Sequence, residues 1–254
     1  SLSNKHTTLR RIFGKAVLWE VIESNPMDGV KKIKATKRRN EVDYYNEDQL
    51  KHLFKVLENV YPKHRLQIKM AALIGLRIGE LAGITLDNIN YNDETILIEK
   101  TLQYDSEAKK LVLVPTKTKE NRTVGIPSEL VPEIKNFAKE QNKLKLRNGN
   151  VWNPFLNDNG DPVNFLFTRE DGYPTHPKVI SGEWRKMIKK YKLPQMPFHG
   201  FRHTCASYMV SKGVNFKIIQ EQLGHSDIRM TLDRYSHLSD ESKKEAINVF
   251  NNIL

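Results

Sequence analysis

The first apolar pattern along the chain is that of an amphipathic helix. Between residues 7 and 24, apolar side chains recur at steps of three and four residues, at Leu9, Ile12, Phe13, Ala16, Val17 and Val21. We expect this helix to end at Asn25-Pro26, because the residue before a proline disfavours the helical conformation. A single amphipathic helix cannot bury its own apolar face. The pattern therefore predicts the last piece of a helical domain, or a helix docked on the rest of the chain.

From about residue 40, a longer region alternates between helical and strand patterns. Helical periodicity occurs at 47–60, 63–75 and 77–82, and Asn46 ahead of two acidic residues is typical of an N-cap. Three strand-like runs follow at 95–98, 111–114 and 122–126, separated by polar turns. Helical patterns return at 129–146, 177–191, 200–212, 215–223 and 239–253. This order predicts an α+β domain that is mostly helical with one small antiparallel sheet.

Charge indicates a polyanionic partner. The 254 residues include 41 Lys and Arg against 30 Asp and Glu, a net charge of +11. Such an excess favours nucleic-acid binding, because neutralising phosphates releases counterions; a basic surface that only keeps the protein soluble is the alternative. A run without acids has the composition of a linker, and we expect it to contact DNA through Lys31, Lys32, Lys34, Lys37, Arg38 and Arg39.

The remaining composition narrows the class of protein. Apolar residues make up 39% of the chain, yet no stretch approaches the roughly 20 consecutive apolar residues that span a bilayer. The first residues do not have the pattern of a signal peptide, and the missing initiator methionine suggests processing or truncation. With a single cysteine, Cys205, an intrachain disulfide is excluded. We therefore expect a protein of the reducing cytosol.

Two arginines lie next to apolar segments. Arg77 stands between apolar neighbours, where burying its guanidinium would be costly unless it is paired, and Glu80 is one helical turn away. Arg202 precedes another apolar helix, three residues after His199. Two guanidinium forks suit the oxygens of a phosphate. For Arg77 alone, a purely structural pair with Glu80 remains the alternative.

Lysine and histidine supply further candidate groups. Lys117 is predicted in the turn of a β-hairpin, where a compact ammonium could protonate a leaving alkoxide. Histidines at 199, 203, 225 and 237 raise the question of a metal, but zinc usually takes three or four closely spaced ligands. Cys205 has no cysteine partner and no acid lies within 199–203, so we expect no metal. Tyr235 alone is unremarkable and could be an aromatic packed on the preceding helix.

Along the chain these candidate residues occur in the order Arg77, Lys117, His199-x-x-Arg202, His225 and Tyr235. The order resembles that of the tyrosine recombinase (phage integrase) family, which shares its catalytic fold with type IB topoisomerases. The resemblance covers residues from about 40 to 254, and the segment 231–237 is most similar to integrases of phages and conjugative transposons of Gram-positive bacteria. It implies a truncated remnant of a helical core-binding domain at 1–30, a basic linker at 31–40 and a catalytic domain at 41–254.

The resemblance also implies a reaction on double-stranded DNA. Tyr235 would attack the scissile phosphate and leave a 3′-phosphotyrosyl link and a free 5′-hydroxyl. Arg77 and Arg202 would clamp the non-bridging oxygens, where charge grows in the transition state. Lys117 would protonate the leaving oxygen, with Lys119 as the alternative acid or a DNA contact.

The remaining family positions receive supporting roles. The resemblance implies that His199 helps to take the tyrosine proton, that His225 donates a hydrogen bond to the phosphate, and that Glu80 orients the site. No metal or other cofactor is needed for this chemistry. The cell compartment implied is the bacterial cytoplasm, in association with the nucleoid.

Two readings of activity and one of assembly stay open at this point. A non-enzymatic DNA-binding module and a topoisomerase-like relaxing enzyme are the alternatives to site-specific recombination. The last helix carries an apolar stripe at Ala246, Ile247, Val249, Phe250, Ile253 and Leu254. The stripe either packs on its own domain or is exchanged with a neighbouring subunit, which would build a homotetramer on DNA.

Overall fold

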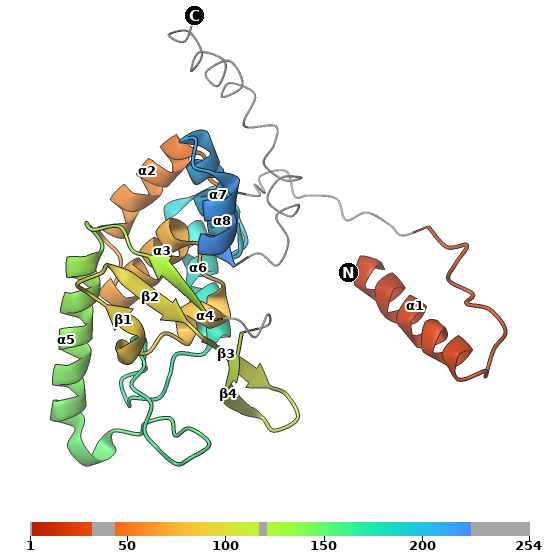
Figure 1. The fold of residues 1–254 in the computed structure, drawn as a ribbon, viewed down its shortest axis with the longest axis horizontal. Coiled ribbons are helices and arrows are strands. Elements are labelled where there is room, and N and C mark those ends of the chain that lie inside the picture. The colour runs from red at the N-terminus through yellow and green to blue at the C-terminus, as the bar shows by residue number, and fades with distance from the viewer. Residues whose placement is uncertain (1, 32–43, 117–120, 225–254) are drawn as a thin grey trace, which may run out of the picture. The chain divides into compact units, whose positions relative to one another are not determined.

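The chain divides into two units, residues 1–41 and 42–254, and each is described by itself (Figure 1). The computed structural model describes residues 2–31, 44–116 and 121–224. Among the described helices, none is long and apolar enough to cross a membrane.

The first unit contains one helix, α1, from Leu2 to Leu18. The expected span of 7–24 was wrong at both ends. The helix stops where Glu20 adopts a left-handed conformation (φ 57°) and the Val21 N–H donates to the Ala16 carbonyl, which closes the last turn. Asn25 instead makes a turn, because its side chain accepts from the Met27 N–H. Within this unit the side chains of Leu9 and Ile12 on α1 are exposed.

The second unit begins with three helices. Helix α2 runs from Glu47 to Leu57, and the predicted N-cap is present: Asn46 and Gln49 form a reciprocal capping box with bonds of 2.9 and 3.0 Å. Helix α3 runs from Pro62 to Ile74, and the short α4 from Ile78 to Ala82. Because α3 packs against α4, α5, α6 and α7, it is the central helix of this unit.

Two small antiparallel sheets replace the single predicted sheet. The first has the order β1–β2–β5, from strands Ile89–Asn90, Thr95–Ile98 and Arg122–Gly125. The second is a hairpin of β3 (Lys100–Asp105) and β4 (Lys110–Pro115). The pattern missed β3 because only Leu102 of its six residues is buried. Since β4 pairs with β3 and β5 with β2, the expected hairpin between β4 and β5 was wrong, and the segment that contains Lys117 joins two different sheets.

Four further helices complete the described part of the second unit, together with 3₁₀ turns at Leu86–Asn88 and Gly149–Val151. They are α5 (Val131–Asn148), α6 (Pro177–Tyr191), α7 (Gly200–Ser211) and α8 (Phe216–Leu223). An aromatic cluster fixes the start of α7, since Phe201 is fully buried with its ring 4.6 Å from that of Trp184. In Figure 1, α7 and α8 lie beside each other, and α8 also contacts β5. The helix expected at 239–253 lies outside the described residues.

Candidate active site

Arg77 stands at the junction between α3 and α4. Helix α3 ends at Gly75, whose φ of 77° is the left-handed conformation that favours glycine. A Cβ on Gly75 would lie 2.4 Å from Leu223 Cδ2, so glycine also allows the close approach of α8. Arg77 itself is extended and is the N-cap of α4. Its guanidinium is paired with Glu80, and its side chain is 39% exposed and therefore accessible to a ligand.

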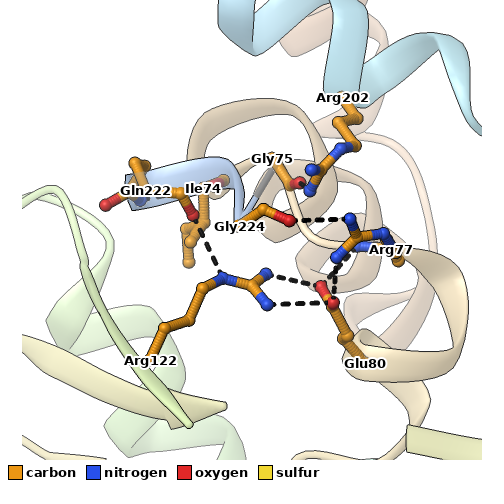
Figure 2. Close-up of polar contacts among 8 residues, drawn as sticks. All are labelled: Ile74, Gly75, Arg77, Glu80, Arg122, Arg202, Gln222 and Gly224. Carbon is orange, nitrogen blue, oxygen red and sulfur yellow. Dashed lines mark hydrogen bonds and ion pairs between the residues drawn. The ribbon is translucent and has the colours of Figure 1, made fainter. Parts of the chain in front are cut away.

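Glu80 is the buried centre of the site. Only 3% of this residue is exposed, and its carboxylate accepts hydrogen bonds from two arginines (Figure 2). Arg77 donates from Nη1 at 2.6 Å and from its backbone N–H at 2.9 Å; Arg122 donates from Nη1 and Nη2 at 3.0 and 2.7 Å. Burial acts to raise the pKa of Glu80, but the hydrogen bonds and charges of Arg122 and Arg77 outweigh it and hold the pKa below its ordinary value. The carboxylate is therefore ionised.

Arg122 is a site residue that the sequence reasoning missed. It opens β5, and its side chain is 13% exposed. One signal was available: strand alternation places Arg122 on the same face as Val124, which is fully buried. Its partner Glu80 is 42 residues away in sequence, so no local pattern links the two.

The end of α8 is tied to this cluster by several bonds. Arg77 Nη2 donates to the Gly224 carbonyl at 2.9 Å, and Arg122 Nε donates to the Gln222 carbonyl at 3.4 Å. The Gln222 amide donates to the carbonyls of Ile74 and Gly125 at 3.3 and 3.2 Å, and its oxygen accepts from the Gly125 N–H at 3.1 Å. The last turn of α8 is thus held by α3, α4 and β5 together.

Arg202 is buried, and the described residues accept only some of its hydrogen bonds. Only 2% of the residue is exposed, and Nη1 donates to the Gly75 carbonyl at 3.0 Å. Its Nη2 is buried and finds no hydrogen-bond partner among the described residues. Burial, followed by the positive charge of Arg77, lowers the pKa of Arg202 to about 9, while Glu80 acts in the opposite direction.

The charges of this cluster do not balance. Three guanidinium groups face one carboxylate, which leaves two positive charges among Arg77, Arg122, Arg202 and Glu80. Nearby Cys205 does not offset them: burial raises the pKa of its thiol to about 12, so the thiol stays neutral. A doubly charged or delocalised anion such as a phosphodiester would satisfy the surplus donors.

Several predicted site residues cannot be placed in this cluster. Lys117, Lys119, His225 and Tyr235 lie outside the described residues, as do the linker residues Lys32, Lys34, Lys37, Arg38 and Arg39. Lys31 is exposed in the first unit. His199 is the N-cap of α7, and its ring lies 4.9 Å from that of His203 in an edge-to-face arrangement. Within the described ranges, no three His, Cys, Asp or Glu side chains come together as metal ligands would.

The fold and the site together define an α+β domain with a cluster of three arginines around one buried carboxylate. The chain belongs to the phage integrase family, whose model matches residues 43–242. This confirms the family resemblance of the sequence.

Curated relatives carry the names of recombinases and integrases. A "Tyrosine recombinase XerC-like" protein of Caldanaerobacter subterraneus subsp. tengcongensis is 27% identical over 96% of this chain and 64% of its own length. The ICEBs1 integrase of Bacillus subtilis is 25% identical, over 100% of this chain and 66% of its own. The transposase from transposon Tn916 of Enterococcus faecalis is 26% identical, over 95% and 59%. The chain therefore spans less than two thirds of the length of these relatives.

A solved structure shows the same fold. The Tn1549 transposon integrase, in complex with a circular intermediate DNA, superposes with a TM-score of 0.76 at 25% identity. The match covers 96% of this chain and 77% of that one. The tyrosine recombinase catalytic fold predicted from the sequence is confirmed.

Proposed function

We propose that this chain is the DNA-cleaving part of a site-specific tyrosine recombinase that cuts and rejoins double-stranded DNA. One observation carries the proposal: Arg202 is buried, its Nη2 has no hydrogen-bond partner among the described residues, and the cluster that it forms with Arg77, Arg122 and Glu80 retains two positive charges. A buried donor without a partner is costly, so a site that keeps one is suited to a ligand that completes it. A phosphodiester offers two non-bridging oxygens for the forks of Arg202 and Arg77.

The chemistry assigned to the site is a transesterification. The Tyr235 oxygen forms a bond to phosphorus while the bond to the 5′ oxygen breaks, and the electron pair leaves on that oxygen. Lys117 protonates the 5′ oxygen, with Lys119 as the alternative, and His199 helps to remove the tyrosine proton. Arg77 and Arg202 stabilise the charge that builds on the non-bridging oxygens. The 3′-phosphotyrosyl link keeps the bond energy, so the reverse attack by a 5′-hydroxyl rejoins the strands.

His225 is proposed as a further donor to the phosphate. It directly follows Gly224, whose carbonyl accepts from Arg77 Nη2 at 2.9 Å. The peptide that leads into His225 is therefore anchored to one of the two arginines. This contact supports the proposal that His225 lies beside the scissile phosphate. The role proposed for Glu80 is to orient Arg77 through their hydrogen bonds.

DNA as the partner is supported by charge and by similarity. The net charge of +11 suits a polyanion, and the Tn1549 transposon integrase is solved in complex with a circular intermediate DNA. We place additional backbone contacts on Lys119 and on the linker, from Lys31 to Arg39. The compartment that fits this substrate is the bacterial cytoplasm, at the nucleoid.

We further propose that residues 1–30 are the end of a core-binding domain, joined through 31–40 to the catalytic domain at 41–254. The exposed Leu9 and Ile12 on α1 fit a helix that packs against more of such a domain. On DNA we expect a homotetramer that exchanges the segment 239–253, whose apolar stripe requires a partner surface.

The test is trapping of the covalent adduct. On a nicked suicide DNA that contains the element's recombination site, cleavage releases the short fragment that bears the new 5′-hydroxyl. The strand can then not be rejoined, so the protein stays attached. Tyr235→Phe should bind this DNA and form no adduct, whereas Tyr61→Phe, at an exposed tyrosine whose ring centroid lies 5.8 Å from that of His64, should react like the wild type. An adduct that persists in Tyr235→Phe would contradict the proposal. Products that join two sites, rather than relaxed plasmid alone, would separate recombination from topoisomerase-like activity.

A further inference from the structure

Arg122 links three parts of the site that must act together. It comes from β5, forms a bidentate pair with Glu80 of α4, and donates from Nε to the Gln222 carbonyl near the end of α8. We propose that Arg122 is a positioning residue for strand cleavage, which keeps Arg77 available to the phosphate and holds the turn that leads into His225. The inference rests on the proposed function and deepens it.

The hydrogen bonds of Glu80 determine which donors of Arg77 it can accept. An ionised carboxylate has about four acceptor positions, and here all four are used: Oε1 accepts from Nη1 of both arginines, and Oε2 accepts from the Arg77 N–H and from Arg122 Nη2. Arg122 thus occupies both oxygens of Glu80 and leaves only one of them for the Arg77 guanidinium. Because of this sharing, Arg77 Nη2 stays directed at Gly224 instead of pairing with Glu80.

The charges of Glu80, Arg77 and Arg122 also indicate that Arg122 keeps Arg77 available to a phosphate. Without Arg122, the buried Glu80 carboxylate would have Arg77 as its remaining bonded cation, and a bidentate Arg77–Glu80 pair would form. The positive charge of Arg77 would then be neutralised before any phosphate arrived. When Arg122 is present, its positive charge balances the charge of the Glu80 carboxylate. Arg77 then keeps its own charge and its exposed edge for the ligand.

Arg122 and its strand also contact the end of α8. Gly224 has φ 65°, and a Cβ there would lie 2.8 Å from Cδ, Nε and Nη1 of Arg122, so the arginine packs directly against this turn. The Gln222 side chain bonds both backbone groups of Gly125, in the strand that carries Arg122. Strand β5 therefore fixes the last turn of α8 from two sides. Any shift of Arg122 would move the peptide that precedes His225.

A structural ion pair elsewhere in the protein provides a matched comparison. Glu133 on α5 also accepts from two cations, Arg65 Nε at 2.9 Å and Lys69 Nζ at 2.6 Å. Both cations belong to α3, and among the described residues no hydrogen bond joins this trio to α4 or α8. Arg65→Met therefore removes an arginine–glutamate pair of similar chemistry without touching the contacts that position Arg77.

The experiment compares two scissile groups in the full-length protein with its recombination site. The rate of adduct formation in a single turnover is measured on a normal phosphodiester and on a methylphosphonate, which lacks the anionic oxygen. The variants are Arg122→Met, Arg122→Lys, Arg65→Met and, as a reference for the clamp, Arg77→Met. Thermal unfolding and affinity for intact duplex are recorded for each variant.

We expect Arg122→Met to bind duplex within about threefold of the wild type and to cleave the phosphodiester about a hundredfold more slowly, as when one transition-state donor is lost. On methylphosphonate the rate of adduct formation by Arg122→Met should be only a few-fold below that of the wild type, and Arg77→Met should behave in the same way. Arg122→Lys keeps the charge but not the fork, and should lose about tenfold. Arg65→Met should cleave both substrates at the wild-type rate.

Two results would overturn the inference: wild-type cleavage by Arg122→Met, or an equal loss on both substrates that Arg65→Met shares through reduced stability. If Arg122→Met does not fold, Arg122→Lys decides in the same way, since an unchanged rate on the phosphodiester would exclude a positioning role. Absence of any adduct with the wild-type protein on either substrate would instead refute the proposed function, and the inference with it.

Discussion

Arg202 donates from Nη1 to the carbonyl of Gly75 at 3.0 Å, which joins the first turn of α7 to the residue that ends α3. The Nη2 of the same guanidinium is buried without a hydrogen-bond partner among the described residues. Both arginines of the proposed clamp therefore depend on the turn at residues 75–77. This turn couples the packing of the core to the chemistry of the site.

Arg202→Met should separate stability from activity. Removing a buried charge that lacks a full set of partners should leave the free energy of unfolding unchanged or raise it. Cleavage should fall about a hundredfold or more, because one guanidinium of the clamp is lost. Inorganic phosphate should stabilise the wild type, by about 1.4 kcal/mol at ten times its dissociation constant, and stabilise the variant less. Thermal unfolding with and without phosphate checks this, and equal stabilisation of both proteins would place the anion elsewhere.

Gly75→Ala should destabilise the protein by about 2 kcal/mol or more, because the left-handed conformation is strained for alanine and the new methyl group meets Leu223. The control is Gly182→Ala within α6, where a Cβ finds nothing within 4 Å. That change should stabilise the protein by about 0.5–1 kcal/mol, since alanine favours the helix. Urea unfolding measures both. A Gly75→Ala protein as stable as the wild type would show that α8 does not need this close approach.

The pH dependence of stability should report on Glu80. Its folded-state pKa lies below its ordinary value of 4.5, so between these two pKa values the unfolded chain binds more protons than the folded one. The stabilisation is therefore complete above pH 4.5 and is lost as the pH falls through the lowered pKa. Glu80→Gln should cost about 3 kcal/mol at neutral pH, because two arginines lose a buried partner. Denaturant unfolding from pH 7 downward should show that the difference in the free energy of unfolding between Glu80→Gln and the wild type decreases below pH 4.5. A difference that does not change with pH would argue against an ionised Glu80.

Lys117 and Lys119 can be distinguished by the leaving group. With Lys117→Ala, cleavage of a normal phosphodiester should slow markedly, and a 5′-bridging sulfur should restore the rate because a thiolate leaves without a proton. Lys119→Ala should weaken DNA binding instead, and the sulfur substrate should not correct that defect. Rescue of Lys119→Ala alone would reverse the assignment.

Local patterns predicted much of this fold, and their failures have physical reasons. The amphipathic periodicity of α2 and the capping signal at Asn46 are properties of neighbouring residues, and both are present. The end of α1 was missed because Glu20, a residue with a Cβ, takes the left-handed conformation that usually marks glycine. Strand β3 was missed because its hairpin buries little apolar surface, so the sequence carries no alternation to detect.

The candidate site shows the same division. The pairing of Arg77 with Glu80 was visible because the two are one helical turn apart. Arg122 was not, since its partners Glu80 and Gln222 are 42 and 100 residues away. The exposure of Arg77 could not be predicted either, because apolar neighbours in sequence do not determine on which side of the turn the guanidinium emerges. Tertiary contacts, absent from any local window, decide both.

The central claim is that Tyr235 forms a 3′-phosphotyrosyl bond in a site clamped by Arg77 and Arg202. The most direct measurement is mass spectrometry of the adduct trapped on a nicked suicide substrate, after digestion with trypsin and a nuclease. The account predicts one peptide modified by a nucleotide on Tyr235, linked through the 3′ phosphate, with a free 5′-hydroxyl on the released strand. A nucleotide on any other residue, or a link to the 5′ phosphate, would contradict it.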